Sequence, residues 1–105
     1  MQLPSTTHLQ FLILGALRGE PTTGRALREH LEEFQVKRSG PAFYQLMARM
    51  EDGGLVEGWY VQQVISGQII RERQYRITAT GTRAWQASRD FYLANIRGVE
   101  GLAGA

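Results

Sequence analysis

The sequence contains no cysteine, which excludes disulfide bonds, cysteine zinc sites and thiol nucleophiles. It has only two histidines, His8 and His30, and neither lies at metal-ligand spacing from another candidate ligand. We therefore predict no metal site and no cofactor. The longest apolar stretch, around 9–17, is too short to span a bilayer, and no basic segment precedes it as in a signal peptide. These absences favour a cytoplasmic protein without a membrane partner.

Signatures of common enzyme chemistry are missing as well. The chain has no Walker-type glycine loop and no nucleophile elbow, and Ser88 and Asp90 lie close together without a base. We expect no enzymatic activity. The 105 residues suit one domain with a modest core.

The net charge is only +2, but the positive charge is unevenly distributed. Residues 59–97 carry six arginines against two acidic residues, and Arg71, Arg73 and Arg76 fall within six positions. A local basic patch of this kind is typical of contacts with nucleic acid phosphates. A solvated strand edge that is blunted by charge is the alternative.

A first helix is predicted over about 5–18, with Ser5 or Thr6 as its N-cap. Its apolar residues lie on nearly every face, so the helix must be buried on more than one side. Burial against a partner subunit and burial in the core of a monomer explain such a helix equally well.

A second helix is predicted over about 22–35, capped by Thr22 or Thr23. Its apolar stripe faces the core, whereas its outer face is charged and includes Arg25 and Arg28. A charged helix face is usually solvated, and we assign this one no function.

A third, short helix is the best defined element of the sequence. Ser39 can cap it, Pro41 suits its first turn, and Gly53-Gly54 ends it. Its apolar stripe, at helical spacing, consists of Phe43, Leu46, Met47 and Met50. The opposite face carries Gln45, Ala48, Arg49 and Asp52, with Tyr44 on its flank. Two helices joined by a short turn, with a compact second helix, are typical of the helix-turn-helix.

The residues after the glycine stop predict a β-hairpin, or wing. Valine, isoleucine and aromatic side chains favour one strand over about 55–65 and another over about 69–78. The predicted wing tip consists of Ser66, Gly67 and Gln68. A last helix follows over 79–97, and the glycine-rich residues 98–105 are expected to form a flexible tail.

This order of elements predicts a mainly α fold with a β-hairpin, the winged helix-turn-helix, with three helices, a two-stranded wing and a C-terminal helix. Residues 1–78 would form the winged-helix DNA-binding domain and 79–97 a C-terminal dimerisation helix, before the tail at 98–105. In this architecture the third helix enters the major groove and the wing lies against the DNA backbone.

Several short motifs occur in order along the chain. A small residue and a glycine open the second helix, and a tyrosine stands early in the third, which ends near a glutamate and Gly-Leu-Val. An Arg-x-Tyr-x-aliphatic-Thr-x-x-Gly passage leads into the last helix. These motifs are Thr23-Gly24, Tyr44, Glu51, Gly54-Leu55-Val56, and Arg73, Tyr75, Ile77, Thr78 and Gly81. In this order and spacing they resemble the PadR-like transcriptional regulators, and the similarity covers about 9–85.

The resemblance implies the short subfamily, in which dimers form through the last helix and the first. The sequence departs from the family at Pro41-Ala42 and at Gln45, where members often have a Gly-Ser pair and a proline. These departures lie in the third helix, so we expect them to affect the choice of operator.

Candidate DNA contacts fall into two classes. Gln and Arg can pair with the major-groove edges of adenine and guanine, and a small apolar side chain can touch the methyl group of thymine. The candidates for reading bases are therefore Gln45, Ala48 and Arg49. The candidates for the DNA backbone are Lys37, Arg38, Tyr44, Arg71 and Arg73. For Arg73 the alternative is an inward position, because it shares the parity of Tyr75 on its strand.

The two most apolar helices supply the candidate dimer interface, which consists of Leu9, Phe11, Leu12, Trp85, Phe91, Tyr92 and Ile96. Trp85 has a second interpretation, as the stacking surface for a small aromatic or cationic effector. We favour interface packing, because aromatic bulk alone does not define a pocket.

The sequence therefore predicts a homodimeric, sequence-specific transcriptional regulator, a repressor, that binds double-stranded DNA at a pseudo-palindromic operator. Release by a small-molecule effector is a further hypothesis. The small net charge keeps one alternative open, a winged-helix module that binds proteins and not DNA.

Overall fold

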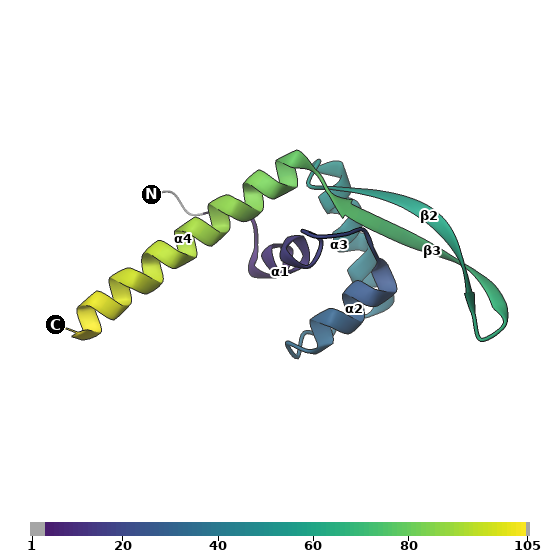
Figure 1. Cartoon of the computed structure of the whole chain (residues 1–105), viewed down its shortest axis with the longest axis horizontal. Helices are drawn as coiled ribbons and strands as arrows, with labels where there is room; N and C mark the ends of the chain where they lie inside the picture. The colour runs from purple at the N-terminus through teal and green to yellow at the C-terminus, as the bar shows by residue number, and fades with distance from the viewer. Residues whose placement is uncertain (1–3, 105) are drawn as a thin grey trace.

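The computed structural model of the chain describes residues 4–104, and their side chains up to residue 96. Three short helices lie between two long projections, α4 on one side and the wing of β2 and β3 on the other (Figure 1). The molecule measures 60 × 26 × 23 Å. The elements are α1 (His8–Ala16), β1 (Thr22–Thr23), α2 (Gly24–Glu32), α3 (Gly40–Asp52), β2 (Val56–Ile65), β3 (Gln68–Ile77) and α4 (Ala79–Gly104). This order confirms the predicted winged helix.

The core lies where the three short helices meet the base of the wing. Its buried apolar side chains are Ile13, Leu14, Leu17, Leu27, Leu31, Phe43, Met47, Met50, Val56 and Tyr75. The predicted stripe of α3 is confirmed, because Phe43, Met47 and Met50 are fully buried and Leu46 packs beside them. Burial of this stripe fixes which face of α3 points to solvent.

Each short helix begins at a capping hydroxyl. Ser39 Oγ accepts a hydrogen bond from Ala42 N at 3.2 Å, as predicted for α3. Thr23 caps α2, which is one of the two predicted caps. The predicted cap of α1 is wrong, because Thr7 caps it in a capping box with Gln10. Thr6 is instead buried, and its hydroxyl bonds the buried hydroxyl of Ser88 on α4.

The sheet has a third, very short strand that the sequence does not predict. Thr22–Thr23 (β1) pairs antiparallel with β3, giving the strand order β1-β3-β2. Two residues are too few to show an alternating pattern. The strand nevertheless matters, because it places the start of α2 beside the wing.

The wing is one regular antiparallel ladder from Val56↔Ile77 to Ile65↔Gln68. Ser66 and Gly67 form the connecting turn, with φ values of 52° and 77°. Two positive φ values match the two-residue hairpin turns that follow the right-handed twist of the strands. The predicted tip is thus one residue too long, since Gln68 already belongs to β3.

The start of α4 is fixed to the junction of α3 and β2. Thr78 Oγ1 donates to the carbonyl oxygens of Gly54 at 2.6 Å and Leu55 at 3.0 Å, and it accepts from Gly81 N at 2.9 Å. A Cβ at Gly81 would overlap the carbonyl oxygen of Leu55. The Thr-x-x-Gly passage is therefore a packing requirement.

The helix α4 continues to Gly104, beyond the predicted end at Arg97 and through most of the predicted tail. Each glycine costs a helix about 1 kcal/mol relative to alanine, which weakens a helix without ending it. No helix among the described residues has both the length and the apolarity to cross a membrane.

Candidate nucleic-acid interface

The exposed face of α3 divides between two hollows. Tyr44 and Ala48 line a groove of about 670 Å³ between α2, α3 and the wing, which we call the wing-side groove. Gln45 and Arg49 line a cleft of about 640 Å³ between α3 and the start of α1, which we call the α1-side cleft. The three predicted base-reading residues are all exposed. They do not form one row, because Ala48 faces the wing and Gln45 and Arg49 face α1.

Positive charge gathers in the wing-side groove. Four arginines line it, namely Arg25, Arg28, Arg71 and Arg73. Two glutamates, Glu51 and Glu72, also line it, which leaves the groove a formal charge of +2. Two of these arginines come from α2, whose charged face the sequence leaves without a function. A groove with a net positive charge attracts phosphate.

Arg73 is engaged within the protein. Its Nη2 donates to Glu51 Oε1 at 2.6 Å, and both side chains are about three-quarters buried. Burial opposes the charged guanidinium, but the hydrogen bond to Glu51 prevails and raises the pKa of Arg73 above its usual value. The structure thus favours the inward alternative for this residue. The pair ties the wing to the end of α3.

Arg71 is exposed, and its guanidinium lies 3.9 Å from the centre of the Tyr60 ring. No carboxylate of the described residues lies within ion-pair distance of it. The aromatic face orients the guanidinium without neutralising its charge. Among the arginines of the wing, Arg71 is therefore the best candidate for a phosphate contact.

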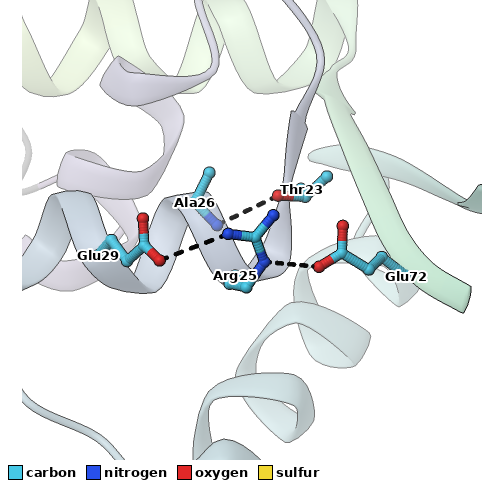
Figure 2. Close-up of polar contacts among 5 residues, drawn as sticks. All are labelled: Thr23, Arg25, Ala26, Glu29 and Glu72. Atoms are coloured by element: carbon cyan, nitrogen blue, oxygen red, sulfur yellow. Dashed lines mark hydrogen bonds and ion pairs between the residues drawn. The ribbon is translucent and has the colours of Figure 1, made fainter. Parts of the chain in front are cut away.

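Arg25 links α2 to the wing (Figure 2). Its Nε donates to Glu72 Oε1 at 2.7 Å, and its Nη1 lies 3.5 Å from Glu29 Oε1. The hydrogen bond and charge of Glu72 raise the pKa of Arg25. The Glu72 side chain is only 10% exposed, and its Oε2 has no hydrogen-bond partner among the residues that the structure describes. Glu72 therefore depends on Arg25 for compensation of its charge.

Arg28 points toward the connection between α2 and α3. Its Nη2 donates to the carbonyl oxygen of Arg38 at 3.2 Å, and no carboxylate among the described side chains pairs with it. Arg28 and Arg71 thus remain uncompensated on opposite sides of the groove. The sequence did not predict Arg25 and Arg28 as part of this site, because the pairing of β1 with β3, which brings α2 beside the wing, was not predicted either.

The remaining backbone candidates lie at the edges of this surface. The Tyr44 ring packs over the first residue of α2, where a Cβ on Gly24 would come within 2.7 Å of its Oη. Lys37 and Arg38 are exposed in the connection before α3, and Arg38 also lines the α1-side cleft. Ser66 and Gly67 are exposed in the turn between β2 and β3, and this end of the wing projects away from the three short helices (Figure 1).

Aromatic side chains join α1 to α4 within one chain. Trp85 stacks on Phe11 with ring centres 5.8 Å apart, and Arg18 lies 3.8 Å from the centre of Trp85. Tyr92 packs against Phe11 and stacks on His8 at 5.3 Å. A ligand that stacks on Trp85 would have to share the ring with these neighbours or displace one of them.

Other members of the candidate dimer interface differ in exposure. Leu9 and Leu12 are partly buried against the core, and Phe91 is partly buried on α4. Ile96 is 53% exposed and Leu93 is 44% exposed. Leu93 and Ile96 therefore present apolar surface to solvent on α4.

The folded chain is similar to known transcriptional regulators. No family model and no curated protein matches the sequence. A PadR family regulator from Eggerthella lenta is 26% identical with a TM-score of 0.71, over 90% of this chain and 80% of that one. A PadR family regulator from Clostridium difficile is 19% identical with a TM-score of 0.74, over 94% and 100% of the two chains.

A third similar structure is Bacillus subtilis PadR in complex with operator DNA. It is 19% identical with a TM-score of 0.61, over 77% of this chain and 47% of that one. These neighbours are transcriptional regulators and not enzymes, in agreement with the predicted lack of enzymatic activity. The fold and the ordered motifs together make the chain similar to PadR-like winged-helix proteins.

Proposed function

We propose that the protein is a homodimeric, DNA-binding transcriptional regulator that places α3 in the major groove and the wing on the adjacent backbone. The observation that carries this proposal is the wing-side groove, which Arg28 and Arg71 both line and where neither pairs with a carboxylate of the described side chains. The similar Bacillus subtilis protein is known as a complex with operator DNA, which supports the same use of this fold here.

The two ion pairs of the groove give the arginines different roles. Arg25 and Arg73 are neutralised by Glu72 and Glu51, so they hold α2, α3 and the wing in one arrangement. Uncompensated arginines bind phosphates and release counterions, whereas paired ones do so only if the pair opens. We therefore assign the phosphate contacts of the groove to Arg28 and Arg71.

Base reading would come from the two sides of α3. Gln45 and Arg49 can each make a bidentate pair in the major groove, worth about 1–3 kcal/mol of discrimination. Ala48 lies on the wing side and suits contact with a thymine methyl group. Tyr44, Lys37 and Arg38 flank this surface and suit the backbone.

A dimer through α1 and α4 accounts for the exposed Leu93 and Ile96. Two-fold symmetry then requires a pseudo-palindromic operator with half-sites about one helical turn apart, roughly 34–36 Å. Repression follows where such an operator overlaps a promoter. A regulator of this kind would act in the cytoplasm, where it has access to the chromosome.

Effector release is a separate part of the proposal. A small aromatic or cationic compound would compete with Arg18 for the face of Trp85. Quenching of Trp85 fluorescence tests this, once Trp59 has been replaced by phenylalanine to isolate the signal. An effector should quench the fluorescence and weaken DNA binding in the same concentration range.

Selection of bound fragments from the source genome by purified protein tests the main proposal. We expect fragments with a shared, two-fold symmetric sequence and an affinity that falls steeply with salt. The alternative is a protein-binding module, favoured by the small net charge and by the two neutralised arginines. It predicts no salt-sensitive binding to any fragment.

A further inference from the structure

The outer end of the wing carries a pair of exposed aliphatic side chains. Val64 and Ile69 are directly opposite each other in the ladder, so they lie side by side on one face of the wing. They are 75% and 74% exposed, the two highest values among the exposed large apolar residues. No charged residue occurs from Tyr60 to Ile70. The wing tip is therefore apolar on one face and neutral throughout.

This face continues the wing-side groove. Side chains alternate between the two faces of a strand, so the register places Val64 and Ile69 on the face of Tyr60 and Arg71. Toward the body the same face carries the ion-paired Arg73 and the buried Tyr75. From the body outward, this face of the wing thus carries first a buried core residue, then arginines, and finally the apolar pair at the tip.

The Val64 and Ile69 side chains lack what a phosphate contact needs. A contact with the DNA backbone uses Lys, Arg or hydrogen-bond donors, and the exposed side chains of this pair offer neither. Apolar side chains that meet DNA do so inside a groove, where they pack on sugars or wedge between base pairs. The chemistry of the pair therefore fits the interior of a groove and not its phosphate rim.

The length of the wing selects which groove. Beyond Trp59, six residues of β2 extend to Ile65, which at about 3.3 Å per residue is about 20 Å. The helical repeat of DNA is about 34 Å, so major and minor grooves follow one another at about 17 Å. With α3 in a major groove, a wing of this length is long enough to reach the neighbouring minor groove.

We propose that Val64 and Ile69 form an apolar wedge that enters the minor groove beside the α3 site and bends the DNA. The inference rests on the proposed DNA-binding function. Minor-groove proteins often insert aliphatic side chains between base steps and bend the duplex by about 20–90°. Pyrimidine–purine steps bend most easily, so the wedge would add sequence preference at positions that α3 does not touch. Gln62, on the same face, is placed to donate to acceptors on the groove floor.

The test is the double substitution Val64→Thr and Ile69→Thr. Threonine keeps the β-branched shape that strands prefer, so the hairpin is retained while the apolar surface is reduced. The probe is the tightest duplex selected from a randomised pool, with a fluorescent donor and acceptor at its two ends. We expect energy transfer to report a smaller bend than with the unchanged protein, and the affinity to fall about tenfold. The salt dependence of binding should stay the same, because no charge is altered.

Two matched variants control the test. Ile65→Thr makes the same change on the opposite face of the tip and should leave the bend intact. Val64→Ile with Ile69→Val keeps the pair aliphatic and should also bend DNA as the unchanged protein does. Equal melting temperatures would show that all variants fold.

Several results would overturn the inference. If the threonine variant binds and bends DNA like the unchanged protein, the tip does not enter the groove. If it loses self-association and keeps its DNA binding, the pair contacts a second copy of the chain. If the unchanged protein shows no salt-sensitive binding to any duplex, the proposed function fails as well, which distinguishes the two outcomes.

Discussion

Replacing Arg71 with glutamine removes an uncompensated positive charge from the wing-side groove and disturbs little else. The guanidinium has no carboxylate partner among the described residues, and its contact is the Tyr60 ring at 3.9 Å. An exposed cation–π contact contributes about 0.5–1 kcal/mol, so we expect a small loss of stability. A dimer loses two phosphate contacts, which should reduce the slope of log K against log salt by about 1.8. Titration of a labelled duplex at several salt concentrations measures that slope.

The matched control is Arg73→Gln, two residues along the same face of β3. This change leaves Glu51 about three-quarters buried without its partner. A partly buried pair lies between the surface and buried cases, so the loss is about 1–3 kcal/mol. Each kcal/mol lowers the melting temperature of a domain this small by about 4–8 °C, and the salt slope should barely change.

These two variants must behave differently for the assignment of roles to stand. If Arg71→Gln leaves the salt slope unchanged, Arg71 does not contact phosphate. If Arg73→Gln lowers the slope as much as Arg71→Gln and keeps full stability, the Arg73–Glu51 pair opens on DNA. Either result would refute the assignment of Arg73 to an intramolecular ion pair and of Arg71 to a phosphate contact.

Three further predictions concern single substitutions. Ser39→Ala removes the N-cap of α3 and should cost about 1 kcal/mol, seen as a lower melting temperature. Gly24→Ala should weaken DNA binding with little loss of stability, since its Cβ displaces the flexible Tyr44 ring; a melting curve beside a binding titration separates the two effects. Burial raises the pKa of Tyr75 from 10.0 to about 12, so its neutral form stabilises the fold fully below pH 10 and less as the pH rises to 12. Tyr75→Phe should make denaturant unfolding less dependent on pH in that range.

The helices of the body were predictable because their signals are local. Ser39, Pro41 and the stripe through Phe43 and Met47 act within one helix, and the structure keeps all of them. The wing was predictable for the same reason, since its strands face each other across a two-residue turn. The correct cap of α1 could also have been predicted from a local signal, because Gln10 stands three residues after Thr7, as a capping box requires.

The wing-side groove was not predictable from local patterns. It depends on β1, which brings Arg25 to Glu72 although the two are 47 residues apart in the chain. The charged face of α2 looks like an ordinary solvated face until the wing is placed beside it. Likewise, only the packing of α3 on α1 separates Gln45 and Arg49 from Ala48.

The salt dependence of DNA binding tests the central claim most directly. Arg28 and Arg71 in two subunits provide four phosphate contacts, which predicts a slope of log K against log salt of about −3.6 or steeper on a selected duplex. Contacts from Lys37 and Arg38 would make the slope steeper. A slope near zero, or no binding to any selected duplex, would contradict the account.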